Sequence, residues 1–178
     1  SLLEDDETLE TALQLVAAGP VFTAAAVRNA QGLAPIAPDP SLSMSADFLR
    51  MLTGNMPGHA EVRALDSYLV TVCDHGLNAS TFAARVVAST RAGLTSACIA
   101  GISALKGPLH GGAPGPVLDM LDDIGKPENA ENWIEKALAR GERLMGFGHR
   151  VYRVRDPRAD ALKAAIKRLP GTSGRIAF

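Results

Sequence analysis

The stretch His59-Ala-Glu-Val-Arg-Ala-Leu-Asp-Ser-Tyr-Leu-Val-Thr-Val-Cys-Asp74 decides the fold class of this 178-residue chain. Its apolar residues recur mostly at helical spacing, and they are Val62, Leu65, Leu69, Val72 and Cys73. A helix turns about every 3.6 residues, so these side chains share one face. Gly76 follows shortly after, and glycine is the usual residue just past a helix end. The stretch therefore predicts one amphipathic helix.

Helical patterns continue on both sides of this stretch. They predict further helices over residues 7–18, 21–30, 45–52, 80–88, 93–105, 117–124, 127–140 and 157–169, with Pro20 directly before the second of them. Residues 32–43 contain Pro35, Pro38 and Pro40, which predicts an extended loop. No strand-like alternation of useful length occurs, so the predicted fold class is all-α.

The composition narrows the class of protein. Hydrophobic residues make up 47% of the chain and aromatic residues only 4%, which favours closely packed helices in one domain or two small lobes. The net charge of -1 argues against a general nucleic-acid binder. No apolar run reaches about 18 residues, so no membrane span is expected. The acidic start fits neither a signal nor a transit peptide, and we expect a cytoplasmic protein.

Two features concern cysteine and metal chemistry. Cys73 and Cys98 have no C-x-x-C partner, so we expect buried free thiols in a reducing compartment rather than a disulfide. No H-x-x-H or H-E-x-x-H pattern occurs, so no metal site is expected.

The predicted helix Gly93–Leu105 is rich in small residues, which let helix backbones approach closely. Two interpretations stay open: an internal core helix, or a subunit interface where the helix meets its symmetry mate.

Two glycine-rich turns each carry one histidine. They are Gly107-Pro-Leu-His-Gly-Gly-Ala113, with His110, and Gly146-Phe-Gly-His-Arg-Val-Tyr-Arg153, with His149. Glycine allows close approach of a ligand to the main chain, and imidazole exchanges protons near neutral pH. His59 fits a surface or capping role, whereas His75 fits a helix cap and a ligand-binding role equally well.

Arginines cluster after the second turn, at positions 150, 153, 155 and 158. They precede a predicted helix start, where backbone N–H groups attract anions, and arginine binds carboxylates and phosphates in a forked geometry. The cluster therefore indicates a small anionic substrate; RNA is the weaker alternative, because the chain is neutral overall and has few aromatic residues.

Three segments in this order resemble the citrate synthase family. They are Asp74-His-Gly-Leu-Asn-Ala-Ser-Thr-Phe82, Leu105-Lys-Gly-Pro-Leu-His-Gly-Gly-Ala113, and Gly146–Arg153 followed by Asp156-Pro-Arg158. The resemblance implies a multihelical homodimer, with residues 1–108 in the large domain and residues 109–178 in the first part of the small, CoA-binding domain. The dimer contact would run through Gly93–Leu105.

The resemblance also implies an activity: acetyl-CoA, the co-substrate, condenses with oxaloacetate and water to give citrate and CoA. The protein is expected to hold no tightly bound cofactor and no metal, and to bind neither nucleic acid nor a membrane. His110 would polarise the thioester carbonyl, and His149 would hydrogen-bond the keto oxygen of oxaloacetate. His75 and Arg158 would hold its carboxylates. Coenzyme A would lie against Leu144, Met145, Gly146, Phe147, Gly148 and Arg153.

One element of the family pattern is missing from this sequence. The family's catalytic base is an aspartate several dozen residues after the Gly-His-Arg motif, whereas Asp156 and Asp160 resemble a helix cap and a first-turn acid. We therefore expect a fragment that is inactive alone and a longer parent that is active. The alternatives are a 2-methylcitrate synthase that takes propionyl-CoA, and a short non-catalytic paralogue that binds carboxylates, CoA or a partner subunit.

Overall fold

The computed structural model describes residues 9–73, 75–112, 114–148 and 156–169, which form helices joined by loops, with no strand among them. In chain order the elements are α1 (Leu9–Ala30), α2 (Met44–Thr53), α3 (His59–Val72), α4 (Ala79–Ser89), α5 (Leu94–Leu105), α6 (Pro114–Ile124), the 3₁₀ turn η1 (Pro127–Asn129), α7 (Ala130–Ala139) and α8 (Arg158–Ile166). The predicted all-α class is confirmed.

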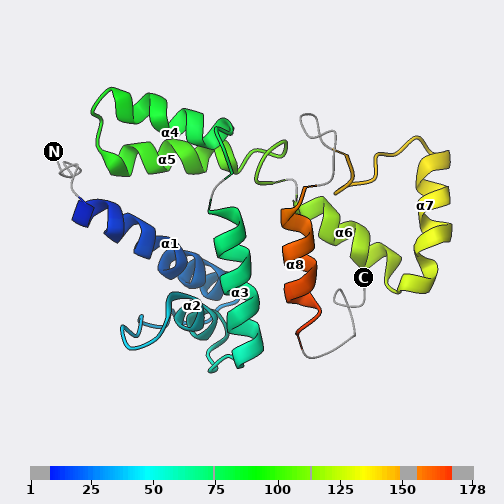
Figure 1. Ribbon diagram of the computed structural model, residues 1–178, viewed down its shortest axis with the longest axis horizontal. Helices are drawn as coiled ribbons and strands as arrows, with labels where there is room; N and C mark the ends of the chain where they lie inside the picture. Colours follow the sequence, from blue (N-terminus) through cyan, green and yellow to red (C-terminus); the bar gives the residue numbers. More distant parts are fainter. Residues whose placement is uncertain (1–8, 74, 113, 149–155, 170–178) are drawn as a thin grey trace.

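The helices gather into neighbouring groups (Figure 1). Helices α4 and α5 form a closely packed hairpin, and α1 packs against both α2 and α5. Helix α8 comes from the far end of the sequence, yet it lies beside α3. Since His75 just after α3 contacts Arg158 at the start of α8, the two helices run antiparallel.

Local signals begin and end the helices where the sequence indicates. The Asn78 side chain accepts a hydrogen bond from the Thr81 N–H at 2.9 Å, which caps α4. At the start of α3 the Glu61 carboxylate accepts the Gly58 N–H at 2.6 Å. Helix α2 ends at Gly54, whose φ of 81° lies in the left-handed region that glycine tolerates.

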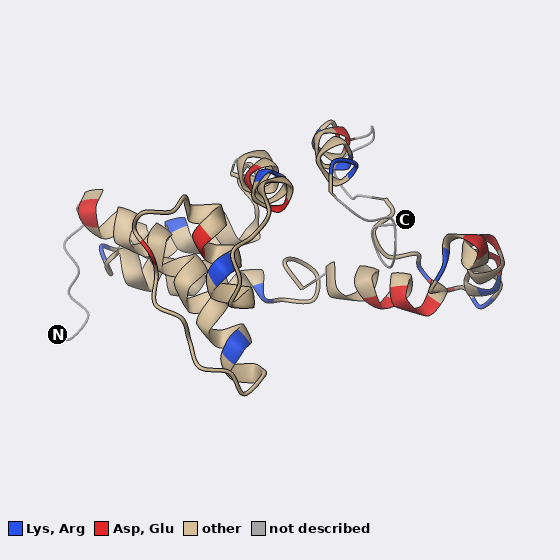
Figure 2. Cartoon of the chain, turned by 90° about the horizontal axis from the view of Figure 1, so that it is seen from below, with Lys and Arg blue, Asp and Glu red and all other residues tan. Residues whose placement is uncertain are grey.

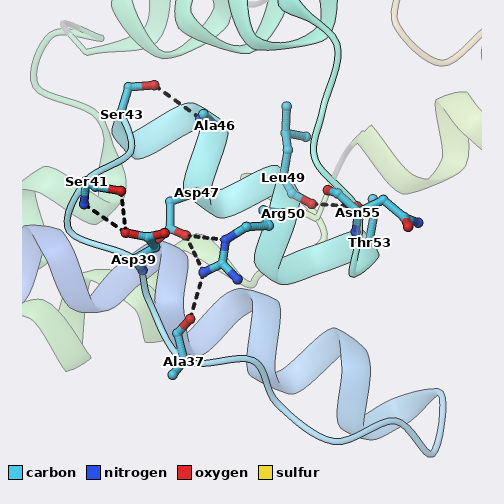
Figure 3. A network of polar contacts seen from close by, with 10 residues as sticks. All are labelled: Ala37, Asp39, Ser41, Ser43, Ala46, Asp47, Leu49, Arg50, Thr53 and Asn55. Carbon is cyan, nitrogen blue, oxygen red and sulfur yellow. Dashed lines mark hydrogen bonds and ion pairs between the residues drawn. The ribbon is translucent and has the colours of Figure 1, made fainter.

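The proline-rich loop before α2 is held by a polar network (Figure 3). Asp47, only 7% exposed, accepts the Asp39 N–H at 3.0 Å and is paired with Arg50 at 2.6 Å. Arg50 also donates to the Ala37 carbonyl at 2.7 Å, while Asp39 accepts the Ser41 N–H at 2.9 Å. Charged hydrogen bonds therefore anchor the extended segment to α2.

The expected division of the first helical region into two helices at Pro20 is wrong. The sequence predicts two helices there, but α1 runs unbroken from Leu9 to Ala30 with Pro20 inside it. An internal proline removes one backbone donor and costs about 3 kcal/mol. Packing of α1 continues beyond the proline and buries Ala24 to 1% exposure.

The continuity of α1 also changes the membrane expectation. Its 22 residues are long and apolar enough on average to cross a membrane by length and composition, although no uninterrupted apolar run of about 18 residues occurs in it. One such helix is weak evidence, because a core helix of a soluble protein passes the same test.

Much apolar surface lies open in the single chain. The buried apolar residues of the described part are few and mostly small: Ala24, Met51, Ala97, Ile124, Ala137 and Ala165. Figure 2 shows that charged residues are sparse over α1–α5, in the left half of the view, and more frequent on α6 and α7.

Cys73 and Cys98 are free and exposed, so their expected burial is wrong for this chain by itself.

Candidate functional site

The turn after α5 holds His110 in a tightly constrained backbone. The Gly107 carbonyl accepts the N–H groups of both His110, at 3.0 Å, and Gly112, at 3.1 Å. A Cβ atom on Gly111 would lie 2.5 Å from the Leu105 carbonyl oxygen, which no real side chain tolerates. Glycine is therefore required at 111 for the chain to fold back against the end of α5.

This turn brings His110 to the start of α4. His110 Nε2 lies 2.9 Å from Ser80 Oγ, and Ser80 Oγ lies 2.8 Å from Asn78 Oδ1. The α4–α5 hairpin makes the contact possible, because it returns the end of α5 to the beginning of α4. Asn78, Ser80 and His110 thus form one hydrogen-bonded chain.

The directions of these hydrogen bonds follow from the groups involved. The Thr81 N–H can only donate, so the Asn78 amide atom facing it at 2.9 Å is the oxygen. Ser80 must donate its single hydroxyl proton to that oxygen. Its Oγ then accepts from His110 Nε2–H, which places the proton of the uncharged ring on Nε2 and leaves Nδ1 as an acceptor.

A second cluster joins α3 to α8. Arg158 Nη1 lies 2.6 Å from His75 Nδ1. A guanidinium only donates, so His75 Nδ1 accepts and the uncharged ring carries its proton on Nε2. His75, just after α3, is therefore a contact of α8, while its predicted role in ligand binding stays a prediction.

Asp156 orients the guanidinium of Arg158. Its carboxylate accepts from Arg158 Nε at 3.0 Å, from Nη2 at 2.7 Å and from the Arg158 backbone N–H at 3.0 Å. These hydrogen bonds hold the pKa of the Asp156 carboxyl below its ordinary value. The bonds from the Arg158 guanidinium have the largest effect, and the bond from the Arg158 backbone N–H has the next largest. The N-cap of α8 is Pro157, one residue after the expected position, yet the Asp156 carboxylate accepts the first backbone N–H of the helix and also holds the side-chain fork.

Both clusters draw on the segment that runs from the α3–α4 loop into the first turn of α4. His75 lies in the loop and contacts Arg158, whereas Ser80 lies on the first turn of α4 and contacts His110. Ser80 is the residue that the sequence analysis does not single out, although it lies in the segment that resembles the family. Its two-residue spacing from Asn78 fits capping and does not reveal a contact with a residue thirty positions away.

The remaining predicted site residues are placed only in part. His149 and Arg153 lie outside the described residues. Leu144, Met145, Gly146, Phe147 and Gly148 form an irregular segment after α7, with Gly146 at a φ of 82° and Gly148 at 77°. A Cβ atom on Gly146 would lie 3.3 Å from Val117 of α6, so this segment passes close to α6. No cluster of metal-binding side chains occurs among the residues that the structure describes.

Comparison with known proteins gives consistent matches. The family model described as "Citrate synthase, C-terminal domain" matches residues 2–176. A protein named "Citrate synthase 2" from Bacillus subtilis is 46% identical over 92% of this chain and 44% of its own length. A "2-methylcitrate synthase" from Mycobacterium tuberculosis is 44% identical over 93% of this chain and 43% of its own length.

Solved structures match equally well. Citrate synthase from Thermotoga maritima superposes with a TM-score of 0.73 at 38% identity, over 89% of this chain and 44% of that one. A ternary complex of the enzyme from Thermoplasma acidophilum with carboxymethyl coenzyme A and oxaloacetate gives a TM-score of 0.75 at 36% identity, over 83% and 39%. The chain spans less than half the length of these relatives, and it belongs to the citrate synthase family.

Proposed function

We propose that the whole protein containing this chain is a citrate synthase, which condenses acetyl-CoA with oxaloacetate and water to give citrate and CoA. The observation that carries the proposal is the segment of residues 75–80, which joins the loop to the first turn of α4: it fixes His110 through Ser80 and presents His75 to Arg158. These contacts join the segments whose sequence matches the family.

His110 is proposed to polarise the thioester carbonyl while acetyl-CoA loses its methyl proton. An uncharged imidazole that donates to this carbonyl from Nδ1 needs its proton there, whereas the resting network places it on Nε2. When Nε2 releases its proton to water and Nδ1 takes one up from water, Ser80 can turn its hydroxyl proton from Asn78 to the deprotonated Nε2. Ser80 therefore serves as a positioning residue that accommodates either tautomer.

Oxaloacetate is proposed to bind near the second cluster, with His75 and Arg158 holding its carboxylates and His149 polarising its keto group. Arginine suits this task because its planar fork matches a carboxylate. Asp156 keeps the fork in place before substrate arrives. A relative solved with oxaloacetate supports this choice of substrate.

Coenzyme A is proposed to lie against residues 144–148 and Arg153. The backbone there takes positive φ values at Gly146 and Gly148, and Phe147 is 68% exposed. The segment therefore presents main chain and an aromatic ring to an incoming ligand. The protein would use CoA only as a co-substrate, with no metal.

Apolar surface supports a homodimer through α5. The division of the chain into residues 1–108 and 109–178 is proposed from the family resemblance alone. Ile99 is 57% exposed, Ile102 63% and Leu105 44%. Contiguous apolar surface of this kind marks an interface, and a second copy of α5 would cover it. We further propose a cytoplasmic protein without membrane or nucleic-acid partners. An Ile102→Glu variant that still sediments as a dimer would contradict the α5 contact.

The function is tested on the full-length protein by measuring CoA release from acetyl-CoA plus oxaloacetate. A kcat/KM for acetyl-CoA above that for propionyl-CoA supports the proposal. The second candidate is 2-methylcitrate synthase, favoured by the 44% identical relative of that name. The two substrates differ by about one methylene, worth roughly 1–3 kcal/mol, so a reversed preference would establish the second candidate.

A further inference from the structure

A cavity lies at the opposite end of the α3–α8 pair from His75 and Arg158. It is partly open to the surface and measures about 430 Å³ between the start of α3 and the end of α8. Its floor consists of Ala60 and Ala64 on α3 and Ala165 on α8, while His59, Arg63 and Arg168 stand around it. The antiparallel arrangement of the helices separates this cavity from the proposed catalytic residues.

The cavity exists because the facing side chains are small. Ala60 and Ala64 are one helical turn apart, so they share the face of α3 that meets α8. Ala165 opposes them from α8 and is 8% exposed. The methyl groups of these three alanines do not fill the space between the two helices. The long side chains of Arg63 and Arg168 also line this space.

The charge in this cavity is of one sign. Among the residues that the structure describes, no acidic side chain lines it and neither Arg63 nor Arg168 forms an ion pair. The nearby Glu61 carboxylate is already engaged by the Gly58 N–H at 2.6 Å. The cavity also opens at the N-terminus of a 14-residue helix, whose dipole adds positive potential.

We propose that this cavity binds a phosphate-bearing small molecule. Two guanidinium groups and an imidazole suit a phosphate or diphosphate, because they supply several forked donors to its oxygens. The volume exceeds that needed by one inorganic phosphate, and the alanine floor accepts an apolar ring or chain. The ligand is therefore either a free polyphosphate or a phosphate ester with an apolar part.

The experiment is an NMR titration of the 178-residue chain with pyrophosphate and, separately, with AMP at constant ionic strength. The His59 ring signal, identified by its loss in His59→Gln, reports the site. A saturable shift at this signal is expected, with the His110 ring signal unmoved. Tighter binding of AMP than of pyrophosphate would identify the phosphate ester as the ligand class, and the reverse would identify the free polyphosphate.

Two variants decide whether the shift arises in the cavity. The double variant R63Q/R168Q should raise Kd by about tenfold or more, while Arg85→Gln, an exposed arginine on α4, should leave it unchanged. Arg63→Lys retains the charge without the fork and should bind with intermediate affinity, which keeps the test valid if the double variant fails to fold. An unsaturable shift, or equal Kd values in R63Q/R168Q and Arg85→Gln, would overturn the proposal.

Discussion

His110 Nε2 lies 2.9 Å from Ser80 Oγ, so a hydroxyl on the first turn of α4 contacts the ring carried by the turn after α5. This contact is the only one described between the His110 ring and another side chain in the part of the chain that the structure covers. It therefore determines how the ring is oriented and which nitrogen carries its proton.

Replacing this hydroxyl should slow the reaction more than it weakens substrate binding. In full-length protein, Ser80→Ala should lower kcat about tenfold, equivalent to about 1.4 kcal/mol, with the KM for oxaloacetate little changed. Ser89→Ala is the matched control on α4, since its hydroxyl only donates to the Val86 carbonyl at 2.7 Å. Equal kcat values for the two variants would refute the positioning role.

Removing the charge of Asp156 should affect oxaloacetate binding first. Without the carboxylate the Arg158 fork loses its fixed orientation, so Asp156→Asn should raise the KM for oxaloacetate by about tenfold with a smaller change in kcat. Glu142→Gln breaks a comparable exposed pair with Arg140, at 2.6 Å, and should leave steady-state kinetics unchanged. A similar KM in both variants would show that the Asp156 fork does not serve the substrate.

The pH dependence of the Asp156–Arg158 pair has a definite sign. Because folding lowers the pKa of the Asp156 carboxyl, the pair contributes its full stabilisation above the ordinary carboxyl value of about 3.9 and loses it as pH falls through the lower folded value. A carboxyl-carbon NMR titration should show the Asp156 midpoint rising in Arg158→Gln. An unchanged midpoint would mean that the guanidinium is not the cause.

The backbone of the His110 turn should reject a methyl group. Gly111→Ala places Cβ 2.5 Å from the Leu105 carbonyl oxygen and should lower the free energy of unfolding by about 2 kcal/mol. Gly115→Ala is the control: nothing lies within 4 Å of its Cβ, and alanine favours α6 by up to about 1 kcal/mol. Urea unfolding followed by circular dichroism measures both variants. Equal midpoints would contradict the close approach.

The sequence predicts those parts of the fold that depend on local signals. Helices α2, α3 and α4 begin and end within a few residues of their expected bounds, because caps and apolar spacing act over a single turn. The break expected at Pro20 is wrong for the opposite reason. A proline before a helical run resembles a helix start, and only packing of α1 against α2 and α5 shows that the helix continues.

The site shows the same division. His75 and Arg158 were expected to act together, and the structure brings them into contact across the α3–α8 pair. The Ser80 contact could not be predicted from spacing, because it requires the hairpin that returns α5 to α4. The exposure of Cys98 likewise depends on which face of α5 packs against α4. The sequence does not determine that face, because small residues occur on every side of the helix.

The most direct test of the proposed function compares two histidine variants of the full-length protein. His110→Gln should reduce CoA release from acetyl-CoA plus oxaloacetate by about a thousandfold, since a flexible amide replaces the fixed imidazole donor at the carbonyl. His59→Gln removes an exposed histidine outside the proposed catalytic residues and should keep the parent rate. A His110→Gln protein that releases CoA as fast as His59→Gln would contradict the account.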